Sequence, residues 1–195
     1  MLILLLLKEK KLTIGESRIV KQMIATKKIT IIGLFTALLC VLSPLSIPIG
    51  PIPITLCTFF VMLSGLVLGW KYGSMSVILY LLLGVVGLPV FAGFTSGIGA
   101  FFGVAGGYMY GYIPLAMCAG ISRAKPIWVK VVFLIVGNML LYSIGTIWYM
   151  FIMEQSLVQS LIVCVFPFLI GDGIKIFSAI FTELAVNKAL KEILF

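Results

Sequence analysis

Residues 157–185 read LVQSLIVCVFPFLIGDGIKIFSAIFTELA, and this run decides the fold class of the chain. It is almost entirely apolar and long enough to cross the roughly 30 Å hydrocarbon core of a bilayer as a helix. Pro167 gives such a long helix a reason to kink. Asp172 and Lys175 interrupt the run with an acid and a base. Ionisable groups at bilayer depth are costly unless they pair or line a polar cavity, so these two are the first candidate site.

The rest of the chain has the composition of an integral membrane protein. Of its 195 residues, 62% are hydrophobic and 10% are charged, whereas about a quarter of the residues of soluble proteins are charged. Lipid admits only structures that satisfy their own backbone hydrogen bonds, and the long apolar runs show no strand alternation. We therefore predict an all-α membrane protein with six transmembrane helices. The six runs are residues 29–43, 54–69, 74–88, 101–121, 131–153 and 157–185.

The positions of the cations predict the orientation of these helices. Half of the 14 Lys and Arg residues precede the first run, and most others lie in the turns 70–73 and 122–126 or in the tail. The Pro- and Gly-rich loops 44–53 and 89–99 carry no charge. The positive-inside rule therefore places both termini in the cytoplasm of a cell-membrane protein. The same distribution argues against a nucleic-acid partner, which would need a basic groove. The orientation of the helices does not explain why Lys175 lies inside an apolar run.

The chain divides into two predicted parts. Residues 29–195 form the six-helix membrane domain, and residues 1–28 form a basic N-terminal extension. In the extension, Ile19, Met23 and Ile24 share one helical face, which is typical of an interfacial helix on an anionic leaflet. A misassigned start, with Met23 as the true initiator, explains the extension equally well.

Asp172 and Lys175 lie three positions apart and would share one face of a helix. In a binding site, Asp172 would accept N–H bonds and Lys175 would donate to a carbonyl or carboxylate. Gly171 and Gly173 remove bulk beside the acid, so a neighbouring helix or a ligand could approach closely. The alternative is an internal ion pair that only fixes the rotation of the helix. The cost of burying charge favours the functional interpretation.

Small residues mark two of the other runs. Gly33 and Ala37 are four positions apart, a spacing that lets helix backbones pack closely within the protein or against a partner subunit. The glycines of residues 101–121 allow the same two interpretations.

The sequence contains few of the residues and motifs that catalysis usually requires. It contains no histidine, its four cysteines lack metal-ligand spacing, and no nucleotide-binding motif is present. We therefore expect no metal, no cofactor and no enzymatic activity, and we interpret the cysteines as packing residues.

Four stretches, taken in order, resemble the BioY family, the biotin-specific substrate-capture (S) components of energy-coupling-factor (ECF) transporters. They are PIGPIPIT at 48–55, GLPVFAG at 87–93, Gly106-Gly107-Tyr108 with Gly111, and PFLIGDGIK at 167–175. The resemblance implies a six-helix subunit that binds biotin near the outer face of the membrane. It also implies association with a transmembrane coupling (T) protein and two cytoplasmic ATPases, which supply the energy for uptake.

The resemblance also implies roles for particular residues. Asp172 and Lys175 match the polar ligand contacts of the family. Further substrate-binding positions around the ring pocket and its lid are Thr55, Phe91, Gly93 and Tyr108. Gly33 and Ala37 match the small-residue motif that contacts the coupling protein.

Two departures from the family pattern keep other functions open. Cys57 stands where glutamine is expected, which removes a pocket hydrogen bond, and Val104-Ala105 replaces a common Pro-Thr. One alternative is an S component for a different vitamin. The other is an intramembrane structural or assembly protein whose Asp172/Lys175 pair only fixes helix packing.

Overall fold

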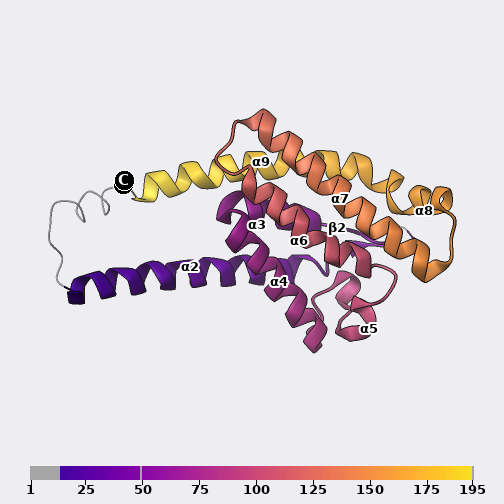
Figure 1. Ribbon diagram of the computed structural model, residues 1–195, viewed down its shortest axis with the longest axis horizontal. Coiled ribbons are helices and arrows are strands. Elements are labelled where there is room, and N and C mark those ends of the chain that lie inside the picture. The colour runs from indigo at the N-terminus through magenta and orange to yellow at the C-terminus, as the bar shows by residue number, and fades with distance from the viewer. Residues whose placement is uncertain (1–13, 49, 195) are drawn as a thin grey trace.

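The computed structural model describes the backbone of residues 14–48 and 50–194, and the side chains of residues 26–48 and 50–188. Over these residues the chain is mostly helical (Figure 1), as the sequence predicted. In order, the helices are α2 (Ile14–Leu42), α3 (Cys57–Leu68), α4 (Trp70–Val86), η1 (Ala92–Phe94), α5 (Gly97–Phe101), α6 (Gly106–Ile121), α7 (Ile127–Met153), α8 (Leu157–Cys164) and α9 (Phe166–Leu194). Two short strands, β1 (Ser46–Ile47) and β2 (Ile54–Thr55), lie between α2 and α3.

The proline-rich loop after α2 is more regular than expected. Its two strands pair in antiparallel register, Ser46 with Thr55 and Ile47 with Ile54. Residues that precede proline are pushed toward extended backbone, which suits such a pairing. The loop that we expected to be irregular is therefore a hairpin, and it lies over the ends of the helices that it connects.

The apolar run 157–185 is broken into two helices. The break falls at Val165, which has φ −122° and ψ −55° and lies directly before the first turn of α9. Pro167 sits in that first turn, where its missing N–H would have no partner inside the helix anyway. The predicted kink at Pro167 is therefore confirmed, in the form of a complete interruption.

Other predicted runs differ from the helices at their ends. The run 101–121 is continuously helical only from Gly106, and the short α5 lies almost entirely before it, where a loop was predicted. The turn predicted at 70–73 is instead the single residue Gly69. Gly69 has φ +83°, a left-handed conformation that side chains other than glycine rarely adopt. This turn allows α3 and α4 to fold back against each other as a helical hairpin.

Two segments are long and apolar enough to cross a membrane on their own, Ile127–Met153 and Leu157–Lys188. Helices α3 and α4 are also apolar but have only 12 and 17 residues. The membrane character predicted from composition is thus supported by two helices, while the count of six spans stays a prediction.

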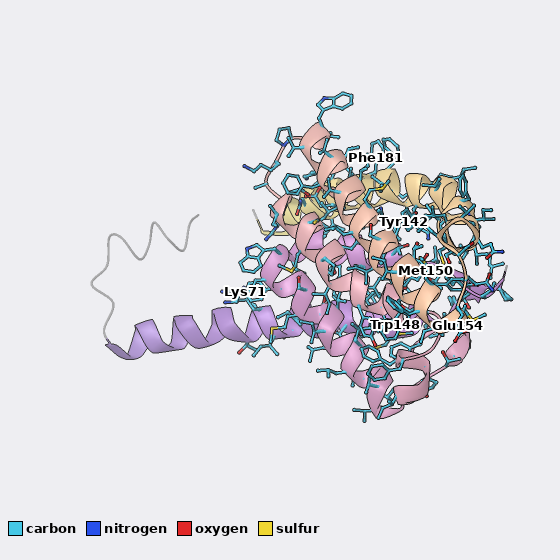
Figure 2. The ribbon with its side chains drawn as sticks, turned by 45° about the vertical axis from the view of Figure 1, so that its right-hand side comes forward. Lys71, Tyr142, Trp148, Met150, Glu154 and Phe181 are labelled. Carbon is cyan, nitrogen blue, oxygen red and sulfur yellow. The ribbon has the colours of Figure 1, made fainter. Side chains whose placement is uncertain are left out.

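The ends of the described chain lie at one end of the molecule. In Figure 1 the N-terminal half of α2 projects from the helical body, and the C-terminal end of α9 lies on the same side. Figure 2 places Lys71 at this end and Glu154 toward the opposite end. The predicted division at residue 28 falls inside the continuous helix α2. Residues 1–13 and the side chains of 14–25 lie outside the described residues, so the two interpretations of the extension stay predictions.

The glycines of α6 serve contacts inside the protein. A Cβ atom on Gly107 would lie 2.4 Å from Cβ of Trp148, and one on Gly111 would lie 3.0 Å from Cα of Leu141. These distances are too short for a side chain, so both glycines are needed for the close packing of α6 on α7. Gly33 differs, because a Cβ there would meet nothing within 4 Å. Gly33 and Ala37 both lie on an exposed face of α2.

Candidate functional site

A cavity lies beneath the β1–β2 hairpin, among α3, α4, α6, α7 and α9. The space free of protein atoms, with the open solvent at its mouth included, amounts to about 570 Å³. Aromatic and aliphatic side chains make up most of its wall, and the polar groups gather on two sides.

One side of the cavity holds the predicted acid and base. Lys175 Nζ lies 2.9 Å from Asp172 Oδ1 and also donates a 3.0 Å hydrogen bond to Thr58 Oγ1. The Thr58 hydroxyl in turn donates to Asp172 Oδ1 over 3.3 Å. Tyr142, on the middle of α7 (Figure 2), donates a 2.6 Å bond to Asp172 Oδ2. Three helices therefore build this charged side: Thr58, Asp172 and Lys175 line the cavity, and Tyr142 holds Asp172 without lining it.

These contacts leave the pair with capacity for a ligand. An ammonium group has three N–H donors, and two of those of Lys175 are used within the protein. A carboxylate offers about four acceptor positions, and Asp172 uses three of them. One donor and one acceptor thus remain close together at the cavity wall. The internal ion pair of our alternative interpretation exists, but Lys175 keeps one unused N–H donor and Asp172 keeps one unused acceptor position.

The other side of the cavity is polar but uncharged. It consists of Ser43, Thr55, Cys57, Tyr80 and Tyr112. Thr55 Oγ1 accepts a 3.2 Å bond from the backbone N–H of Cys57, whose thiol donates weakly to the Tyr80 hydroxyl over 3.9 Å. The hydroxyl of Ser43 is buried beside Cys57 and Tyr80, and among the described residues no hydrogen bond of standard geometry satisfies it. An unsatisfied buried hydroxyl at a cavity wall is a natural contact for a ligand.

The six predicted substrate positions fall into two groups. Asp172, Lys175, Thr55 and Tyr108 line the cavity. Tyr108 also donates a hydrogen bond to the backbone carbonyl of Cys164 at the break between α8 and α9.

Phe91 and Gly93 lie outside the lining. Phe91 is fully buried and packs edge-on against Tyr80, with ring centroids 5.8 Å apart. Gly93 adopts φ +67°, and its N–H donates a 3.1 Å bond to the carbonyl of Pro44. Phe91 therefore supports the cavity wall by packing against Tyr80, which lines it. Gly93 supports the wall through its hydrogen bond to the loop that follows α2. Their contact with a ligand stays a prediction.

Gly171 and Gly173 do not have the effect that we expected. A Cβ atom on either residue would meet nothing within 4 Å, and neither residue lines the cavity. The expectation that they permit close approach of a neighbouring helix is wrong, because they face open space beside α9.

Sequence reasoning missed several residues of the site. Thr58 and Tyr142 hold Asp172, while Ser43, Tyr80 and Tyr112 form most of the uncharged side. Each is a small polar group or a tyrosine inside an apolar run, where it is also compatible with ordinary packing. Only the tertiary arrangement of four helices brings them to one cavity. Cys57, interpreted as a packing residue, also lines it.

Comparisons with known proteins agree on one family. The family model described as the BioY family matches residues 13–192. The chain is 38% identical over 154 residues to the "Probable biotin transporter BioY" of Pyrococcus horikoshii, covering 79% of this chain and 92% of the relative. It is 36% identical over 165 residues to the "Biotin transporter BioY2" of Lactococcus lactis, covering 83% and 91%.

A solved structure has the same fold. The crystal structure of the S-component for biotin from an ECF-type ABC transporter superimposes with a TM-score of 0.78 at 30% sequence identity. The superposition covers 84% of this chain and 92% of that one.

Proposed function

The chain belongs to the BioY family, and from this premise we propose that it captures biotin as the substrate-binding (S) subunit of an ECF-type ABC transporter. The observation that carries the proposal is the cavity with Asp172 and Lys175 in its wall. Biotin combines a cyclic urea with an apolar ring and chain and a terminal carboxylate. A mostly apolar cavity with a few convergent polar groups suits such a ligand.

The charged side of the cavity fits the urea better than the carboxylate. A carboxylate placed there would lie beside Asp172, and two anions close together in a low-dielectric site repel strongly. The urea is neutral and presents N–H donors next to a carbonyl oxygen. Its N–H would reach the spare acceptor of Asp172, and its oxygen the spare donor of Lys175. We therefore assign the urea to Asp172 and Lys175.

The remaining wall suits the rest of the ligand. The rings of Tyr80, Tyr108, Tyr112 and Phe168 supply apolar surface, and burial of such surface is worth roughly 25 cal/mol per Å². Ser43 adds a neutral hydroxyl to the wall. The carboxylate of biotin then points toward the opening of the cavity.

The proposal also covers the arrangement of the chain in the membrane and its partner proteins. We propose six spans within a membrane domain of residues 29–195, following the basic extension of residues 1–28, with both termini in the cytoplasm of the cell membrane. The exposed Gly33 and Ala37 on α2 leave a smooth surface on which a transmembrane coupling (T) protein would pack. Two cytoplasmic ATPases would drive uptake, so this chain itself is not an enzyme and needs no cofactor.

Equilibrium binding of labelled biotin to the purified, detergent-solubilised protein tests the function. We expect saturable binding of one biotin per chain at micromolar ligand or below. Desthiobiotin, which keeps the cyclic urea, should compete, whereas the diamine formed by removing the urea carbonyl should not. Absence of binding by protein that elutes as a single folded species would refute the proposal.

The uncharged side of the cavity gives a second candidate, an S component for another vitamin. Cys57 stands in the wall where the family resemblance leads us to expect glutamine, so the hydrogen bonds offered to the ligand differ there. A panel of unlabelled vitamins competing in the same assay separates the candidates. Displacement of biotin by another vitamin at lower concentration would favour the second.

A further inference from the structure

A second buried ion pair joins α7 to α9, away from the cavity. Lys130 Nζ lies 2.7 Å from Glu183 Oε2, and the two side chains are only 6% and 1% exposed. The other carboxylate oxygen, Oε1, accepts a 2.6 Å bond from Asn187 Nδ2. Lys130 lies near the N-terminal end of α7, where a cation normally reports helix orientation, but its burial requires another explanation.

The two ion pairs lie on one face of α9. Glu183 follows Asp172 by eleven positions, and at about 100° per residue the two side chains differ in direction by roughly 20°. On α7, Lys130 precedes Tyr142 by twelve positions, so the distances along both helices match at about 16–18 Å. The Tyr142–Asp172 and Lys130–Glu183 contacts therefore bridge the same two helices at two levels.

Packing and polar bridges together determine how α9 is rotated, because its buried residues also pack in the core. Its outward residues Ile174, Phe177 and Phe181 are exposed, and the inward Ile176, Ala179 and Ile180 are apolar as well. Lipid is as apolar as these side chains, so no hydrophobic force distinguishes the two faces. Gly171 and Gly173 contribute no side chain that could fix the rotation beside the cavity. The polar bridges of α9 therefore add to the packing of its buried residues in fixing its orientation.

We propose that Lys130 is a positioning residue for ligand capture, which acts through Glu183 to hold α9 in the rotation and depth that keep Asp172 and Lys175 at the cavity. An unpaired buried carboxylate at position 183 would turn α9 to bring the charge toward water. The same turn would carry Asp172 away from Tyr142 and Thr58. The inference rests on the proposed function, because its readout is the affinity for biotin.

The experiment measures the biotin dissociation constant and the thermal midpoint of each variant on purified protein. Lys130→Met should raise the dissociation constant by about tenfold or more. Glu183→Asp keeps the charge but shortens the side chain by one carbon, so it should fold readily and weaken binding by about threefold. The exchange of both charges, Lys130→Glu with Glu183→Lys, should restore affinity to within about threefold of the wild type. Glu154→Gln removes an exposed carboxylate at the end of α7 and should leave affinity unchanged.

The outcomes separate the inference from the function on which it rests. If the wild type does not bind biotin, the proposed function fails. If it binds, and the folded Lys130→Met and Glu183→Asp proteins bind with wild-type affinity while only their thermal midpoints fall, the pair is purely structural and the inference is overturned. Should Lys130→Met not fold, Glu183→Asp and the charge exchange decide between the same two results.

Discussion

Tyr142 donates a 2.6 Å hydrogen bond from α7 to the carboxylate of Asp172 on α9, so an ionisable group of one helix is held by a neutral group of another. The bond uses one oxygen of the carboxylate and leaves the other to Thr58 and Lys175. The acid is therefore oriented from three sides before any ligand arrives, and such preorganisation reduces the cost of binding.

Loss of either member of the charged pair should weaken biotin binding. We expect Asp172→Asn and Lys175→Met each to raise the dissociation constant by at least about tenfold, or about 1.4 kcal/mol. Each change removes a ligand contact and also leaves the other charge without its partner. Equilibrium binding measures the loss, and membrane insertion should persist. Wild-type binding by both variants would show that the pair only fixes helix packing.

The hydroxyl of Tyr142 should matter for affinity without touching the ligand. Tyr142→Phe keeps the ring and removes one hydrogen bond to a charged group, a change worth about 1.5–3 kcal/mol at most. Because Tyr142 does not itself touch the ligand, only part of this energy reaches the binding equilibrium, and we expect roughly a three- to tenfold rise in the biotin dissociation constant, or about 0.6–1.4 kcal/mol. Ser143→Ala is the matched control, because it removes an exposed hydroxyl from the next position of α7. Equal effects of the two substitutions would contradict the orienting role.

The smooth face of α2 should be needed for assembly and not for capture. Ala37→Trp places a large side chain on the exposed surface beside Gly33 and should block copurification with the coupling protein. Biotin binding by the isolated subunit should remain within about twofold of the wild type, because Ala37 does not line the cavity. Val132→Trp, on the exposed face of α7, controls for the bulk of the new side chain. Intact copurification of Ala37→Trp would count against this surface.

Two glycine substitutions should have opposite consequences for stability. Gly107→Ala forces a Cβ atom to within 2.4 Å of Trp148 Cβ, and overpacking of this kind costs about 1–3 kcal/mol. Gly171→Ala meets nothing within 4 Å, and alanine in a helix interior is favoured over glycine by roughly 0.5–1 kcal/mol. Thermal unfolding in detergent should show a lower midpoint for the first and an equal or higher one for the second. A lower midpoint for Gly171→Ala would mean that the glycine has a contact outside this chain.

The sequence predicted most of the helical framework because that framework depends on local pattern. Long apolar runs, the interruption at Pro167 and the closely packed glycines such as Gly107 are all visible along the chain. The hairpin of Ser46 and Thr55 was missed, since two-residue strands leave no periodic pattern. The turn at Gly69 was displaced because the apolar runs on either side of it give no sharp boundary.

The sequence could predict the candidate site only where a charged residue interrupts an apolar run. Asp172 and Lys175 are conspicuous for that reason. Thr58, Tyr142 and Ser43 are not, because hydroxyl groups are common in membrane helices and only their tertiary partners distinguish them. Lys130 is not conspicuous either, since a cation near a helix end normally reports orientation. Its partner Glu183 lies 53 residues away, and nothing local connects the two.

The break at Val165 separates the C-terminal apolar run into two helices that are held in place by different contacts. Helix α9 is held to α7 and α3 through its charged groups, whereas Tyr108 of α6 donates its hydrogen bond to the C-terminal end of α8, at the carbonyl of Cys164. Val165 joins the two helices through one hydrogen bond to Leu161 and one from Phe168. Because Tyr108 also lines the cavity, a ligand that contacts its ring would contact the same residue that holds the end of α8.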